Sequence, residues 1–193
     1  MSILELPPWK IDFLQSLDWR LFETLCAKVF EAAGYQATET NDGPDGGIDI
    51  HLRMGNDPSG DIAVQCKRQK KPIETSQVRE FYGAAKQSGA SRAIFVTTGS
   101  FDQRSLDEFQ DCGDLCLIDG NQFIEGIHEL GRGTADNFMK FILGQPEWSI
   151  PTCPKCTTKM IRRVNKESNE AFWGCENFSR KNGPACRMTF PVG

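Results

Sequence analysis

Two short stretches decide how this chain folds, Asp45–Ile50 (DGGIDI) and Val64–Arg68 (VQCKR). Each has the apolar content of a strand, yet each carries polar residues where a fully buried strand would be apolar. Because successive side chains of a strand point to opposite faces, Gln65 and Lys67 are expected to project from the same face. The two stretches are predicted to pair as the strands of a hairpin.

Helix-like and strand-like segments alternate around this hairpin. Apolar residues recur every three or four positions over 18–33, which predicts an amphipathic helix that ends at Gly34. Further helices are expected at 73–88, 102–110 and 121–130, and strands at 35–39, 48–52, 62–67, 93–97 and 115–118. A helix, three strands and then alternating helices and strands predict an α/β sandwich with a mixed sheet.

The composition is that of an ordinary soluble globular protein, with 39% hydrophobic and 25% charged residues among 193. No apolar run approaches the roughly 18 residues that a membrane-spanning helix needs. The N-terminus lacks the basic-then-apolar pattern of a secretory signal. We therefore expect a cytoplasmic protein with reduced thiols and no membrane partner.

The polar residues of the two stretches suit phosphodiester hydrolysis, which needs a cation to neutralise developing charge and to acidify the attacking water. Asp49 and Gln65 offer the hard oxygen ligands that Mg²⁺ prefers. Lys67 could orient or deprotonate the water, or stabilise the transition state. Glu23 is the expected source of a further carboxylate, and Asp45 is a further candidate ligand, although a turn role is favoured for it. The alternative is a solvated strand face without catalytic function.

These residues also carry a family resemblance. The resembling residues are Phe22-Glu23, Gly34-Tyr35, Asp45–Asp49, Val64–Arg68, Phe95–Gly99 and Phe101. Together they resemble the Mrr-type restriction endonuclease domain of the PD-(D/E)xK nuclease superfamily, over residues 12–130. The resemblance implies a restriction-endonuclease-like mixed sheet flanked by helices and a Mg²⁺- or Mn²⁺-dependent deoxyribonuclease. It also implies that Asp49 and Gln65 hold the metal, that Lys67 is the catalytic lysine, and that Glu23 matches an acidic residue of the first helix.

Two positions depart from the superfamily pattern. Ile48 replaces a proline, and Gln65 replaces the second acid, as is usual in the Mrr branch. A neutral ligand binds metal more weakly, so cleavage is expected to depend strongly on metal concentration. The resemblance implies type IV defence against foreign or modified DNA, with a second copy of the chain or other defence-system subunits as candidate partners. A catalytically degenerate DNA-binding protein and a repair or junction nuclease of the same superfamily stay open as alternatives.

Four of the eight cysteines crowd together near the end of the chain, at Cys153, Cys156, Cys175 and Cys186. In a cytosolic protein such clustering favours metal binding over disulfides. Four thiolates are the closed tetrahedral ligand set of one structural Zn²⁺. The segment is too short to bury an adequate core, so the metal is expected to supply the missing stability. The alternatives are four idle thiols, or a disulfide formed on oxidation.

The residues around these cysteines, over 153–190, resemble the C4 zinc ribbon at the C-terminus of type IA topoisomerases. The resembling residues are Cys153–Cys156 (CPKC), Met160–Val164 (MIRRV), Phe172–Cys175 (FWGC) and Cys186–Phe190 (CRMTF). The resemblance implies DNA binding, with single strands favoured. The predicted DNA contacts are the aromatic Trp173 and Phe178 for base stacking, and Lys155, Arg162, Arg163 and Arg180 for phosphates. For Trp173, packing against the zinc site is an equal alternative.

Charge is distributed unevenly along the chain. Residues 151–193 hold eight Lys or Arg and three Glu, a net charge of +5, whereas the remaining residues hold 14 basic and 23 acidic side chains, a net charge of −9. An acidic body with a basic tail is one way to bring a nuclease to a polyanion. We therefore predict a nuclease domain over 1–131, a linker over 132–151 with a candidate docking helix at 137–143, and a zinc ribbon over 152–193.

Overall fold

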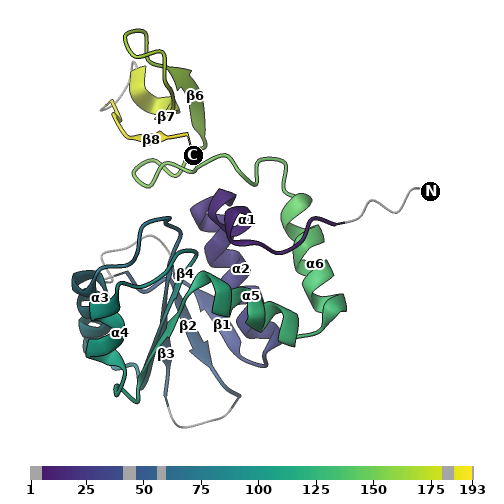
Figure 1. Cartoon of the computed structure of the whole chain (residues 1–193), viewed down its shortest axis with the longest axis vertical. Helices are drawn as coiled ribbons and strands as arrows, with labels where there is room; N and C mark the ends of the chain where they lie inside the picture. The colour runs from purple at the N-terminus through teal and green to yellow at the C-terminus, as the bar shows by residue number, and fades with distance from the viewer. Residues whose placement is uncertain (1–5, 41–46, 56–59, 180–184, 193) are drawn as a thin grey trace.

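The computed structural model describes residues 6–40, 47–55, 60–179 and 185–192. The larger part of the molecule is built on one five-stranded sheet (Figure 1). Its strands follow the order β1 (Gln36–Glu39), β2 (Ile50–Arg53), β3 (Ile62–Lys67), β4 (Arg92–Thr97) and β5 (Leu115–Ile118). Strand β2 is antiparallel to both β1 and β3, whereas β3, β4 and β5 are parallel. The mixed sheet and the β2–β3 hairpin confirm the predicted α/β class.

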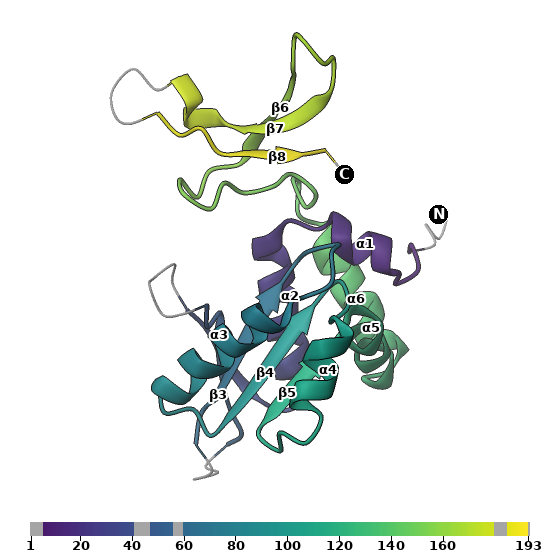
Figure 2. The same ribbon diagram turned by 60° about the vertical axis from the view of Figure 1, so that its left-hand side comes forward.

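Helices cover both faces of this sheet (Figures 1 and 2). One face packs against α1 (Ile11–Ser16), α2 (Trp19–Ala32), α5 (Gly120–Glu129) and α6 (Arg132–Leu143), and the other against α3 (Thr75–Gln87) and α4 (Gln103–Phe109). Burying an apolar stripe of each helix against an apolar sheet face is what holds the layers together. Among the described residues, no helix is both long and apolar enough to cross a bilayer.

Helix α2 shows how the sequence produces this packing. Phe22, Leu25 and Val29 recur at helical spacing and are all buried against the sheet and the neighbouring helices. The ring of Phe22 meets that of Phe123 on α5 edge to face, with the ring centroids 5.6 Å apart. Such aromatic pairs add about 0.5–1.5 kcal/mol beyond the area that they bury. Helix α2 is therefore fixed between the sheet and α5.

Two helices differ from the expectations. Helix α1 was not predicted, and its Leu14 is fully buried in the core beneath α2. Helix α6 includes the candidate docking helix at 137–143 but begins at Arg132, and Phe138 and Ile142 bury its apolar face in the same core. The expected division of the chain at residue 131 stays a prediction.

A second, three-stranded sheet follows, with the order β6 (Met160–Val164), β7 (Ala171–Cys175) and β8 (Thr189–Pro191). Both pairs of neighbours are antiparallel. We call residues 152–192 the cysteine module. Its small core contains Met160 and three of the cysteines, with Cys156, Trp173 and Phe190 packed against them. The module lies at the end of the molecule where α1 and the start of α2 lie (Figures 1 and 2).

Candidate active site and cysteine cluster

Asp49 lies immediately before β2, and its carboxylate is held against β3. The backbone N–H of Asp49 donates to the carbonyl of Val64 at 2.8 Å. In return, the Asp49 Oδ2 atom accepts a hydrogen bond from the backbone N–H of Cys66 at 2.6 Å. A hydrogen bond to an ionised carboxylate is stronger than one between neutral groups. It therefore orients Asp49 beside Gln65 and Lys67, which flank Cys66 in the chain.

The chain bends at Asp49. The strand expected to begin at Ile48 begins at Ile50, and Ile48 packs in the core beneath α3 whereas Ile50 packs in the core beneath α2. A regular strand would place both isoleucines on one face. Thr40 fixes the bend, because its hydroxyl donates to the Ile48 carbonyl at 2.7 Å and its N–H donates to the Asp49 carbonyl at 2.9 Å.

Gln65 packs against the turn that precedes Asp49. Gly47 in that turn has a φ of +84°, and a Cβ placed there would lie 2.4 Å from the Gln65 Nε2 atom. The Oε1 atom of Gln65 is farther from the same point, at 4.0 Å. The amide nitrogen therefore faces the turn, and the amide oxygen is directed away from it.

Lys67 ends β3, and its backbone is fixed from the neighbouring strand β4. The hydroxyl of Thr97 donates to the Lys67 carbonyl at 2.9 Å, and the N–H of Thr98 donates to the same oxygen at 3.2 Å. In the parallel register Gln65 lies opposite Phe95, and Lys67 lies opposite Thr97. The side chains of Gln65 and Lys67 are both half-buried and share one face of the strand, as predicted.

Glu23 lies half-buried on α2. Burial raises the pKa of the thiols of Cys26 and Cys66, and the negative charges of Glu23 and Asp49 raise both pKa values further. The two carboxylates are therefore close enough to act on the same pair of thiols. Asp45, the other candidate metal ligand, lies outside the described residues.

Arg68 is a residue at this strand end for which the sequence pattern indicated no role. Its guanidinium donates from Nη1 to the carbonyl of Gln15 at 2.8 Å, while the Gln15 side chain donates to the carbonyl of Thr98 at 3.1 Å. Desolvation by burial lowers the pKa of Arg68 from its ordinary value. Helix α1 thus holds an arginine at the carboxyl ends of β3 and β4. Apolar residues spaced like a helix at Trp9, Phe13, Leu14 and Leu17 were the signal that could have revealed α1.

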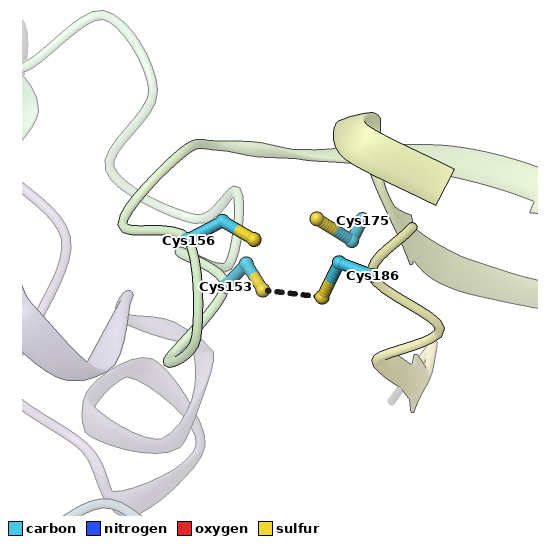
Figure 3. Close-up of side chains that lie close together, drawn as sticks. All are labelled: Cys153, Cys156, Cys175 and Cys186. Atoms are coloured by element: carbon cyan, nitrogen blue, oxygen red, sulfur yellow. Dashed lines mark hydrogen bonds between the residues drawn. The ribbon is translucent and has the colours of Figure 1, made fainter. Parts of the chain in front are cut away.

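The four predicted zinc ligands lie together in the cysteine module (Figure 3). The sulfur atoms of Cys153, Cys156, Cys175 and Cys186 all lie within 4.8 Å of one another. Those of Cys153 and Cys186 are 3.7 Å apart. Tetrahedral zinc with Zn–S bonds of about 2.3 Å places its sulfur ligands about 3.8 Å apart. The cluster therefore has the size of a tetrahedral metal site.

The backbone holds the cysteines in two pairs. In the first pair the N–H groups of Cys156 and Thr157 both donate to the carbonyl of Cys153, which closes a tight turn. In the second, the N–H of Cys175 donates to the Met188 carbonyl at 3.0 Å, and the N–H of Met188 lowers the pKa of Cys186 to about 7. Burial raises the pKa of Cys175 to about 12, so the two thiols of this pair differ in how readily they lose the proton that metal binding displaces.

The predicted DNA contacts fall on both faces of the small sheet. Arg162 lies opposite Trp173, and Arg163 lies opposite Phe172, so the two arginines project from opposite faces. Trp173 is half-buried against the cysteine core. On the other face the Arg163 guanidinium lies 5.8 Å from the ring centroid of Phe178, which is 49% exposed. Lys155 is exposed on the cysteine turn, and Arg180 lies outside the described residues.

Comparison with protein families gives a match over most of the larger part of the molecule. Residues 14–127 match the model of the Mrr catalytic domain, described as a restriction endonuclease. The type IV methyl-directed restriction enzyme EcoKMrr of Escherichia coli (strain K12) is 26% identical over 124 residues. The aligned part is 62% of this chain and 41% of that enzyme, so the chain spans less than half the length of this relative.

Two solved structures are similar to the chain. The DNA modification-dependent restriction endonuclease AspBHI has a TM-score of 0.46 at 17% identity, covering 74% of this chain and 44% of that one. The MspJI restriction endonuclease, in complex with a 27-mer oligonucleotide, has a TM-score of 0.45 at 19% identity, covering 70% and 34%. The family match ends before the cysteine module, so the role of the module rests on its own residues.

Proposed function

The chain belongs to the Mrr-type restriction endonuclease family, and on that premise we propose that it is a metal-dependent endonuclease that hydrolyses the phosphodiester bonds of DNA. One observation carries the proposal beyond the family. The Asp49 carboxylate is hydrogen bonded to β3 between Gln65 and Lys67, within the matched residues. A carboxylate, an amide and an ammonium group at one strand end supply the groups that this reaction needs.

The donor set fits a hard divalent cation. The Asp49 carboxylate and the Gln65 amide oxygen would hold Mg²⁺ or Mn²⁺, with the Cys66 carbonyl as a third donor and Glu23 as a further candidate ligand. The orientation of Gln65 supports this role, because its amide nitrogen faces Gly47 and its oxygen points away. When bound, the cation supplies charge neutralisation and lowers the pKa of the attacking water.

Lys67 supplies the remaining group that the reaction needs, an ammonium group. Its ammonium group orients the attacking water or stabilises the charge that develops on the phosphate. The hydrogen bonds from Thr97 and Thr98 to its backbone carbonyl support this role, because they restrict where the side chain can reach. A charge positioned in advance costs no reorganisation when the reaction occurs.

Replacing Lys67 tests this assignment. For Lys67→Ala, we expect cleavage of supercoiled plasmid to vanish over a titration of Mg²⁺ and Mn²⁺, while affinity for DNA changes only a few-fold. Lys140→Ala is the control, since Lys140 is exposed on α6 and contributes nothing to the proposed site. Cleavage by Lys67→Ala at the wild-type rate would contradict a catalytic role for Lys67. An inactive wild-type chain that still binds DNA would identify a degenerate nuclease.

We further infer that the substrate is foreign or modified DNA, and that double-strand cutting uses two copies of the chain or other defence-system subunits. The inference rests on the relative EcoKMrr, which is a methyl-directed enzyme. Matched methylated and unmethylated plasmids test it, with a branched junction as a third substrate. Preferential cutting of the methylated plasmid supports defence, whereas preference for the junction would favour a repair nuclease.

For the cysteine module we propose one structural Zn²⁺ and a DNA-binding surface. The metal is supported by four cysteine sulfur atoms within 4.8 Å of one another, with those of Cys153 and Cys186 3.7 Å apart. The arginine and aromatic side chains of the Arg163–Phe178 face support the surface, since bases stack on aromatic rings and phosphates pair with guanidinium groups. Lys155 and Arg162 are further candidate contacts, and Trp173 has the competing role of packing against the core.

Removing two ligands tests the zinc proposal. For the double variant Cys153→Ser and Cys156→Ser, we expect loss of about one equivalent of zinc by elemental analysis, a lower melting temperature and weaker DNA binding. Cys116→Ser is the matched control, because Cys116 is an exposed cysteine outside the cluster. If zinc content, melting temperature and DNA affinity are the same in both variants, the cluster is not a zinc site.

A further inference from the structure

Asp18 occupies the N-cap position of α2 but does not cap the helix. An Asp at this position normally accepts hydrogen bonds from the first N–H groups of its helix. Here the carboxylate is 4% exposed and is directed at the cysteine module. Its Oδ1 atom accepts from the Thr152 N–H at 3.0 Å, and its Oδ2 atom accepts from the Thr152 hydroxyl and the Lys159 ammonium, both at 2.7 Å.

Further bonds converge on the same segment. The indole N–H of Trp19 donates to the Thr152 carbonyl at 2.8 Å, so every polar group of Thr152 is bonded to the start of α2 or the residue before it. The backbone N–H of Asp18 donates to the Trp148 carbonyl at 2.8 Å. A buried carboxylate without partners would be costly, and these contacts satisfy it only when the module is docked.

The same contacts are built into the cysteine turn. Thr152 and Lys159 are partners in a β-bridge that brackets Cys153 and Cys156. The N–H of Cys153 donates to the carbonyl of Thr158 within this bracket. The groups that hold Asp18 are therefore presented by the segment that carries half of the candidate zinc ligands.

Asp18 also acts by its charge on Arg68, which follows the end of β3. The charge of Asp18 raises the pKa of Arg68, although burial has the larger, opposite effect. Arg68 directly follows Lys67 and is hydrogen bonded to α1. Asp18 is thus hydrogen bonded to the cysteine module and acts by its charge on the residue next to Lys67.

We propose that Asp18 latches the cysteine module to the nuclease domain through Thr152 and Lys159, and that it is a positioning residue for cleavage. Resting on the proposed function, the latch fixes the direction from which DNA held by the module reaches Asp49 and Lys67. A flexible tether raises only the local concentration of DNA. A fixed attachment also removes orientational freedom before binding, which lowers the entropic cost of a productive complex.

The tumbling of the two parts tests the latch without any catalysis. In the full, zinc-loaded chain, ¹⁵N relaxation should give one rotational correlation time for the amides of β1–β5 and β6–β8. For Lys159→Met and for Asp18→Ser, we expect a shorter correlation time for β6–β8 than for β1–β5. Serine is itself a good N-cap residue, so Asp18→Ser keeps α2 intact. Lys159→Arg should restore joint tumbling, and Lys166→Ala, which removes a charge from an exposed turn of the module, should leave it unchanged.

Cleavage kinetics test the positioning role. On a duplex long enough to reach both parts, we expect KM to rise several-fold in Lys159→Met with kcat unchanged, and Lys159→Arg to restore KM. Joint tumbling in both Lys159→Met and Asp18→Ser would overturn the latch. Separate tumbling with unaltered KM would overturn the positioning role alone. If the wild-type chain cuts no DNA with any metal, the proposed function fails and the positioning role fails with it, while tumbling still decides the latch.

Discussion

At the scale of single residues, the candidate site depends on a contact between a turn and a strand. Gly47 has a φ of +84°, which disfavours any other residue, and a Cβ placed there would have to displace the Gln65 amide. The same contact turns the amide oxygen of Gln65 away from the turn. A substitution at Gly47 should therefore act on stability and on metal use together.

For Gly47→Ala, we expect a loss of about 1–2 kcal/mol in the free energy of unfolding from left-handed backbone strain. We also expect a large loss of cleavage, because the new methyl group displaces Gln65. Urea unfolding and plasmid cleavage over a metal titration measure the two effects. Gly89→Ala is the control, because Gly89 has a φ of +83° with no atom within 4 Å of the added Cβ. Equal losses of cleavage in both variants would argue against a role for the Gly47–Gln65 contact.

At the scale of elements, most of the fold could be predicted from the sequence. Helix α2 follows from the helical spacing of its apolar residues, and strands β3 and β4 follow from short, largely apolar runs. Helix α1 was missed because its apolar spacing is a short signal over six helical residues, and bonds between Gln15 and the distant Arg68 and Thr98 help to hold it. The start of β2 also escaped prediction, since the hydroxyl of Thr40 sets it from eight residues away.

The candidate site, like the fold, could be predicted from the sequence only in part. The alternation of side chains along a strand is enough to predict that Gln65 and Lys67 share one face. The latch could not be predicted from the sequence, because Asp18 is separated from Thr152 by 134 residues and from Lys159 by 141. Local periodicity carries no information about such pairs. A short polar residue before a helix also has a simpler local explanation, as a helix cap.

Asp114 joins α3 to the start of β5 and provides a test by pH. The ammonium group of Lys86, the hydroxyl of Tyr82 and the thiol of Cys112 hold its pKa below the ordinary 3.8. A lowered pKa in the folded state contributes stability that is present above pH 3.8 and is lost as the pH falls towards the folded-state value. The stability that Asp114 contributes should therefore disappear at acidic pH.

For Asp114→Asn, we expect a lower free energy of unfolding than wild type at neutral pH, and a difference that shrinks as the pH falls to about 3. Urea titrations at a series of pH values measure it. Asp136→Asn on α6 removes the same charge from a site without these partners, and should give a difference that is nearly constant with pH. A constant difference for Asp114→Asn as well would contradict the role of the Lys86–Asp114 pair.

At the scale of the whole molecule, the two parts that the latch joins differ in net charge. The chain before residue 151 carries a net charge of −9 and the remainder +5. The net charges therefore disfavour approach of a polyanion to the larger part and favour its approach to the module, whose charge a bound zinc tetrathiolate would reduce by about two. On the proposed function, DNA contacts the module first and reaches the nuclease domain in a direction that the module sets.

For Arg163→Ala, we expect weaker DNA binding and a plot of log affinity against log salt that is less steep by about 0.7 to 0.9, the contribution of one phosphate contact. Fluorescence anisotropy with labelled oligonucleotides at several KCl concentrations measures the slope. Arg132→Ala removes an exposed arginine from α6 and should leave the slope unchanged. An unchanged slope for Arg163→Ala would assign phosphate binding to other residues of the module.

The docking of Thr152 on Asp18 and Trp19 has a consequence for recombination between proteins. Joining two genes within the segment 144–151 would exchange the module without its attachment site, because Asp18 and Trp19 lie more than a hundred residues upstream. A chimera with a foreign module would contain every catalytic and metal-binding part, but those parts would be held together only by the chain. A transferable unit must include the Asp18-Trp19 pair together with Thr152 and Lys159, so natural or engineered shuffling has to change two distant segments of the chain at once.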